Sequence, residues 1–149
     1  MGFSAWGLAI GLAVLAPNLL LPLFPPRTTI PSSPVPRALG WLERAGQALC
    51  LVVPALTASG DPVWWWSIPM LAALTGYYAL WARYLLGGRR GPDLYRPLGV
   101  LPVPMAVLPV LVFLASAGWL GSAWIAASAV VLAAGHVPAA ALIARGQGA

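Results

Sequence analysis

Apolar residues in this chain gather into five long runs, and short polar or proline-rich segments separate them. Each run has about 20 residues, which is the length an α-helix needs to cross roughly 30 Å of hydrocarbon. The predicted spans are residues 3–24, 39–58, 63–86, 99–118 and 123–144. The pattern therefore predicts an all-α fold: a five-helix transmembrane bundle that forms one integral membrane domain over residues 1–149.

Prolines mark the irregular parts of this pattern. The segment 25–37, PPRTTIPSSPVPR, is too rich in proline, serine and threonine for a helix, so it is predicted to be an extended cytoplasmic linker. Pro17 and Pro22 each remove a backbone donor, so we expect the second half of the first run to bend. The first run is too long for a signal peptide and lacks a basic start, so it is predicted to be a retained span.

Composition supports lipid as the solvent of this chain. It is 60% hydrophobic and only 7% charged, with a mean hydropathy of +0.85, whereas soluble domains carry about 25% charged residues. The net charge of +5 then indicates a bilayer with anionic headgroups as a partner, and no nucleic acid. Abundant alanine, glycine, proline and arginine without lysine is typical of a bacterial protein from a GC-rich genome, which places it in the cell membrane.

The arginines occupy alternate connections between the runs. The first and third connections and the carboxyl-terminal tail hold Arg27, Arg37, Arg89, Arg90, Arg96 and Arg145. The amino terminus and the second and fourth connections hold none. Short loops rich in arginine stay in the cytoplasm, so the predicted topology is N-out and C-in.

Five polar residues from four of the runs fall at similar depth. A helical rise of 1.5 Å per residue puts them about 6–14 Å from the predicted cytoplasmic ends. They are Asn18, Glu43, Gln47, Tyr77 (or its neighbour Tyr78) and His136. Polar side chains are costly when they face lipid, so we expect most of them to turn inward. Two interpretations stay open: a cytoplasm-facing pocket that binds a ligand, or hydrogen bonds that only join helices, with Glu43 at the interface.

Metal, cofactor and catalytic roles find little support in the sequence. His136 is the only histidine, so it lacks partners for a metal or haem site, and no cofactor is expected. A bond to a carbonyl freed by Pro138, or proton handling, suits it better. The single cysteine, Cys50, excludes an internal disulfide and is expected to pack in the core. No catalytic residues are predicted, and an enzyme is disfavoured.

Two interpretations also stay open for the basic segment between the third and fourth runs. Its arginines are Arg83, Arg89, Arg90 and Arg96. They are candidates for contact with an anionic headgroup through forked hydrogen bonds. The alternative is that they serve only to orient the chain in the membrane.

The runs APNLLLPLFPPR, LERAGQ, YYALWARYLLGGR and AAGHVP resemble a group of short multi-pass bacterial membrane proteins that has no characterised activity. The resemblance implies no activity, cofactor or site. The expected function is a non-enzymatic accessory or scaffold component that works as a homo-oligomer or beside a membrane protein partner. The alternative is a small permease or lipid-handling protein with a cytoplasm-facing polar pocket.

Overall fold

The structure, a computed structural model, describes residues 2–29, 34–58 and 60–146, and within these ranges it contains helices and no strand. The α-helices are α1 (Ala5–Asn18), α2 (Leu20–Leu23), α3 (Arg37–Leu56), α4 (Ser67–Leu86), α5 (Pro104–Trp119) and α6 (Ala123–Gly146). Two short 3₁₀ helices, η1 (Trp64–Trp66) and η2 (Gly91–Leu94), precede and follow α4. Since α2 continues the line of α1, the chain forms five long helices, and the predicted all-α class is confirmed.

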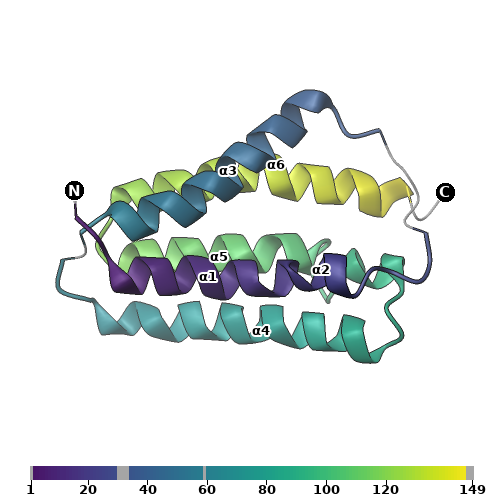
Figure 1. Cartoon of the computed structure of the whole chain (residues 1–149), viewed down its shortest axis with the longest axis horizontal. Helices are drawn as coiled ribbons and strands as arrows, with labels where there is room; N and C mark the ends of the chain where they lie inside the picture. The colour runs from purple at the N-terminus through teal and green to yellow at the C-terminus, as the bar shows by residue number, and fades with distance from the viewer. Residues whose placement is uncertain (1, 30–33, 59, 147–149) are drawn as a thin grey trace.

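The five helices run side by side and their connections alternate between two ends (Figure 1). Helix α3 packs most extensively on α6, α6 packs on α5, α5 on α4, and α1 on α3. The "arginine end" comprises residues 24–29, 34–36, 87–103 and the end of α6; the "tryptophan end" comprises residues 2–4, 57–58, 60–66 and 119–124. All side chains of the predicted polar layer lie on helices that connect these two ends.

Prolines and a glycine account for two departures from regular helix. The first run is interrupted at Leu19, between Pro17 and Pro22, each of which lacks the N–H that would continue the hydrogen-bond ladder. The predicted start of the fourth run at residue 99 is wrong. Gly99 has φ +55° at the tip of a tight turn, and α5 begins only at Pro104, where a missing N–H costs nothing.

The proline-rich linker is partly described. Residues 30–33 lie outside the described residues. The described remainder of the linker contains no helix, and α3 begins at Arg37, directly after Pro36. Two hydrogen bonds tie the linker to the connection after α4: the Arg27 N–H donates to the Arg89 carbonyl, and the Gly91 N–H to the Thr28 hydroxyl.

Within the described ranges, two helices are long and apolar enough to cross a membrane by length and composition. They are the α1–α2 unit, Ala5–Leu23, and α6, each with a mean hydropathy of 1.8. Helix α5 is apolar but shorter. Length and composition are the only criteria behind this count, and the core helices of soluble proteins and signal sequences meet them as well.

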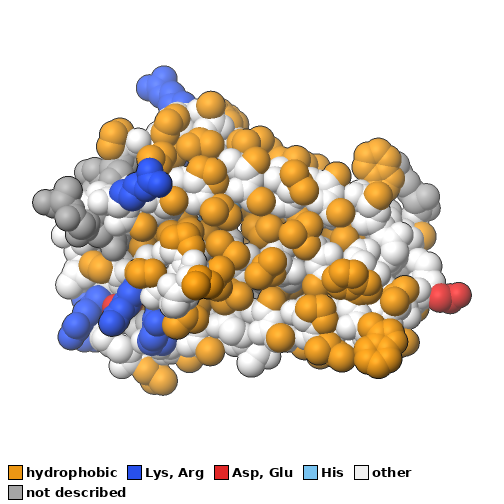
Figure 2. All heavy atoms as spheres, turned by 180° about the vertical axis from the view of Figure 1, so that it is seen from behind, with side chains coloured by type: hydrophobic (Ala, Val, Ile, Leu, Met, Phe, Trp, Pro, Cys, Tyr) orange, Lys and Arg blue, Asp and Glu red, His pale blue; other side chains and the backbone are white. Residues whose placement is uncertain are grey.

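Charge and apolar surface are separated on the molecule. Figure 2 shows basic side chains gathered at one end of the molecule, an acidic side chain at the other, and an apolar surface between them. Large apolar side chains are strongly exposed along the helices between the two ends, among them Leu12, Leu71 and Val130.

The aromatic side chains divide between this surface and the core. Trp81 and Tyr84, whose positions near the basic segment suggest an interfacial belt, are instead buried. At the tryptophan end the buried Trp119 ring packs edge-to-face between Trp6 and Trp64, with ring centroids 5.3 and 5.6 Å away. The three rings also line a surface groove of about 320 Å³ between α1 and α4.

Candidate functional site

Two glycines bring Glu43 and His136 together. A Cβ atom at Gly46 of α3 would collide with the backbone of Leu132 on α6, and one at Gly135 of α6 with the backbone of Glu43 on α3. The two helix backbones are thus in direct contact at both places, as small residues allow. Glu43 and His136 lie beside these contacts, and their side chains meet with Nδ1 and Oε1 2.6 Å apart.

The Glu43–His136 contact is the only ion pair among the described residues. Each side chain is 26% exposed, so the pair is partly shielded from the surroundings. With Glu43 ionised, the Nδ1–H of His136 donates the hydrogen bond, because a carboxylate has no proton to give. Nε2 of the imidazole is then left to accept a hydrogen bond, or to donate one when the ring is protonated.

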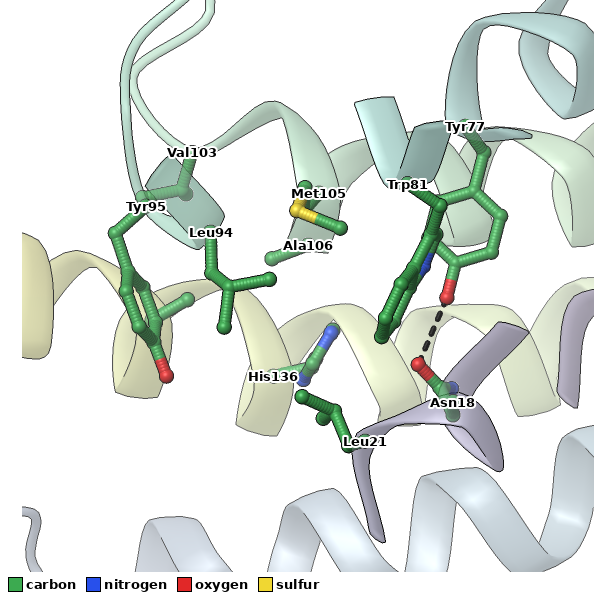
Figure 3. A pocket seen from close by; sticks show the side chains of 11 residues that line it. Asn18, Leu21, Tyr77, Trp81, Leu94, Tyr95, Val103, Met105, Ala106 and His136 are labelled. Carbon is green, nitrogen blue, oxygen red and sulfur yellow. Dashed lines mark hydrogen bonds between the residues drawn. The ribbon is translucent and has the colours of Figure 1, made fainter. Parts of the chain in front are cut away.

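A second polar pair joins α1 to α4. The Tyr77 hydroxyl donates to Oδ1 of Asn18 over 2.8 Å (Figure 3). Tyr77 is buried, whereas Asn18 sits at the end of α1, directly before the break at Leu19. The break and the hydrogen bond together hold the Asn18 amide against the interior.

Both polar pairs lie at two adjoining cavities. The first has a volume of about 110 Å³ and is lined by Asn18, Tyr77 and His136, together with mainly apolar side chains (Figure 3). The second, of about 70 Å³, is lined by Gln47 and again by Asn18 and His136. Glu43 lines neither cavity and reaches them only through His136. All five residues of the predicted polar layer therefore lie at or next to these two open cavities, but only Tyr77 is buried, and Asn18 and Gln47 are exposed at the surface.

Two polar residues that line the first cavity, Trp81 and Tyr95, are not part of the predicted polar layer. Trp81 is buried, and its Nε1–H faces the Tyr77 phenol but makes no hydrogen bond of acceptable geometry. In the sequence, Trp81 stands four residues after Tyr77, and this spacing indicates that both rings lie on one helix face. Tyr95 follows η2 at the cavity's arginine end, and no periodic pattern marks it.

The charge of Glu43 affects the pKa of Tyr95. Burial raises the pKa of the Tyr95 hydroxyl, and the nearby Glu43 carboxylate raises that pKa further by charge repulsion. The phenol is therefore a neutral hydrogen-bond donor at the arginine end of the cavity. Its ring separates the cavity from a larger surface groove that it also lines.

The four arginines of the basic segment do not form one cluster. Nη2 of Arg83 lies 3.5 Å from the Asp93 carbonyl, and the Arg89 guanidinium lies 5.9 Å from the centre of the Phe24 ring. Arg90 is exposed, while Arg96 lines the surface groove beside Arg145 of α6. Contact of these arginines with a headgroup stays a prediction, and the structure divides them among different surroundings.

Cys50 is buried and lines the second cavity. Within the described part of the chain, no three histidine, cysteine, aspartate or glutamate side chains are grouped so that they could hold a metal ion. The arrangement can bind a small polar molecule through donors and acceptors on several helices, and it can move a proton between Glu43 and His136.

The fold and site together define a helical bundle with two adjoining, mainly apolar cavities toward the arginine end, which a few polar side chains line. No protein-family model matches the chain, and no match was found among curated proteins or solved structures.

Proposed function

We propose that this chain is a five-span membrane protein, N-out and C-in, that acts as a small permease for a small polar solute. The separation of arginines from the tryptophan end supports the orientation, because basic connections stay in the cytoplasm. The strongly apolar surface between the two ends supports lipid as its surroundings. In this orientation the cavities lie nearer the cytoplasmic side, and the contacts of Trp119 with Trp6 and Trp64 lie nearer the other side.

The convergence of polar groups from four helices on one space is the observation that carries the proposal. Helices that only needed hydrogen bonds to associate would leave no cavity at those bonds. The first cavity is somewhat smaller than the ~150 Å³ cavity that accommodates benzene in an engineered protein. It therefore suits a solute of about six non-hydrogen atoms or fewer. The Glu43–His136 pair offers such a solute a proton.

Cysteine labelling tests the orientation. In a Cys50→Ala background, Asp61→Cys should react with a membrane-impermeant maleimide added to intact spheroplasts. Arg90→Cys should react only after the membrane is permeabilised. The opposite pattern would overturn the N-out, C-in topology, and labelling of both positions from one side would mean that α4 does not cross the membrane.

A second labelling experiment tests whether the cavity contains water. Ala106 is buried and lines the first cavity, whereas Ala117 on the same helix is buried and lines neither cavity. In the Cys50→Ala background, Ala106→Cys should react with a small methanethiosulfonate reagent in inside-out vesicles, and Ala117→Cys should not. Equal protection of both cysteines would mean that the cavity is dry.

Solute flux tests the function itself. Proteoliposomes would be given inward gradients of urea, formamide, glycerol or ammonium acetate, with sucrose as a solute too large for the cavity, and their volume followed by light scattering. Wild-type protein should speed the entry of at least one small solute, and Glu43→Gln should abolish this effect without loss of folded protein. If wild-type and protein-free liposomes behave alike for every small solute, the permease proposal is wrong.

One observation favours the accessory or scaffold role as a second candidate. The first turns of α3 diverge from α6 (Figure 1) and expose Trp41, which is 70% accessible and is covered only by the Arg44 guanidinium, 5.6 Å from its ring centre. Such a face suits contact with another membrane protein or a second copy of the chain. Oxidative cross-linking of Trp41→Cys in the Cys50→Ala background should then give a dimer in membranes, and its absence would exclude a homo-oligomer through this face.

A further inference from the structure

A surface groove at the arginine end lies outside the cavities described so far. It runs between the connection from η2 to α5 and the last turns of α6, and its volume is about 460 Å³. Arg96 stands on the connection side of this groove and Arg145 on the α6 side. Its other walls are mainly apolar and include Pro97, Val103 and Ala144.

The two arginines of the groove are available to a ligand. Both are exposed, and neither forms an ion pair with a carboxylate within the described ranges. Asp93 also lines the groove. One of its carboxylate oxygens lies against Gly87 at the end of α4, within 3.9 Å of where a Cβ atom would stand. The groove thus carries two guanidinium groups and one carboxylate, and cationic groups are in excess.

The turn beside the groove is apolar and exposed. Leu98 and Leu101 exchange backbone hydrogen bonds across a tight turn, and this turn presents Val100 with 97% of its surface accessible. A valine so exposed next to two arginines is unfavourable in water but suits the headgroup boundary of a bilayer, where apolar side chains enter the acyl region. The turn and the groove are therefore expected to lie at the same level of the membrane.

We propose that this groove binds one anionic phospholipid of the cytoplasmic leaflet, with its phosphate between Arg96 and Arg145 and its acyl chains along Val103 and Ala144. Guanidinium groups bind phosphate oxygens by forked hydrogen bonds, and an apolar floor below them distinguishes a lipid from a free phosphate. The proposal rests on the membrane orientation given above, and it does not depend on what the cavity binds.

Native mass spectrometry of the purified full chain in mild detergent tests the proposal. Dioleoylphosphatidylglycerol and dioleoylphosphatidylcholine share the same acyl chains, so their comparison isolates the headgroup charge. Wild-type protein should retain one phosphatidylglycerol in preference to phosphatidylcholine. The double variant Arg96→Gln/Arg145→Gln should bind phosphatidylglycerol about 30-fold more weakly, since each arginine near an anionic surface contributes about one factor of five.

The matched control is Arg27→Gln/Arg37→Gln, which removes the same charge from exposed arginines of the linker, outside the groove. This control should bind phosphatidylglycerol as the wild type does. An equal loss of phosphatidylglycerol binding in both double variants would mean that net charge alone explains the effect, and it would overturn the proposal. Equal retention of the two lipids by the wild type would also overturn it. Competition by sn-glycerol 3-phosphate at the lipid's own concentration would indicate a soluble-anion site instead. Lipid retention is measured independently of solute flux, so failure of the lipid-site proposal is distinguishable from failure of the permease proposal. Maleimide labelling tests the membrane orientation separately.

Discussion

The contact between α3 and α6 and the contact between α1 and α4 are built in opposite ways. Gly46 and Gly135 let the α3 and α6 backbones touch, and nothing larger fits between them. Helices α1 and α4 make few backbone contacts, and tyrosine side chains of α4 bridge the distance. The α3–α6 contact is thus narrow and the α1–α4 contact is wide, and the cavities lie between the two. Glycine in the narrow contact and tyrosine in the wide contact together create them.

Three hydroxyl groups of α4 hold the wide contact. Tyr77 donates to Asn18, Tyr78 to the Ala13 carbonyl and Tyr84 to the Phe24 carbonyl, over 2.8, 2.8 and 3.0 Å. Such bonds contribute only about 0.6 to 1 kcal/mol each. The narrow α3–α6 contact therefore determines whether the bundle forms, whereas the wide α1–α4 contact can loosen at small cost.

The largest effect is expected from a single methyl group at the narrow contact. Gly46→Ala and Gly135→Ala should each destabilise the protein by about 2 kcal/mol or more, because the new Cβ atom meets backbone that cannot move aside. SDS-induced unfolding in mixed micelles measures this. Gly40→Ala on α3 is the matched control: a Cβ atom there meets nothing within 4 Å, so the substitution should be neutral or slightly stabilising. Equal effects at positions 40 and 46 would contradict the close contact.

The helices and the level of the polar layer could be predicted from sequence because both follow from local periodicity and the fixed helical rise. The pairing of Glu43 with His136 rather than with Arg44 or Arg83 depends on Gly135, whose role is visible only once α3 lies on α6. The grouping of Arg96 with Arg145 likewise depends on where the η2–α5 connection folds, and no periodic signal determines that.

A smaller effect is expected at the wide contact near the cavity. Tyr77→Phe removes the hydroxyl that binds Asn18, and Tyr84→Phe removes the one that binds the Phe24 carbonyl. Each should cost about 1 kcal/mol of unfolding free energy, and the double variant about the sum, since the two bonds share no partner. The same unfolding assay measures these costs. A loss as large as that of Gly135→Ala would mean that the two helix contacts do not differ in kind.

The smallest effect concerns the Tyr78 hydroxyl and explains why it binds Ala13. Pro17 has no N–H, so the carbonyl of Ala13, one turn earlier in α1, lacks its helical partner. The Tyr78 hydroxyl donates to that carbonyl over 2.8 Å and replaces the missing bond. Tyr78→Phe should therefore destabilise the protein by only about 0.6 kcal/mol.

A double-mutant cycle separates this explanation from simple packing of the Tyr78 ring. In a Pro17→Ala background the helix supplies its own N–H to Ala13, so Tyr78→Phe should then cost almost nothing. The coupling energy should equal the whole cost of the single substitution, about 0.6 kcal/mol. Tyr84→Phe serves as the control, because its acceptor at Phe24 does not depend on Pro17, and its cost should be the same in both backgrounds. If Tyr78→Phe costs as much with alanine at position 17 as with proline, the hydroxyl does not compensate for the proline.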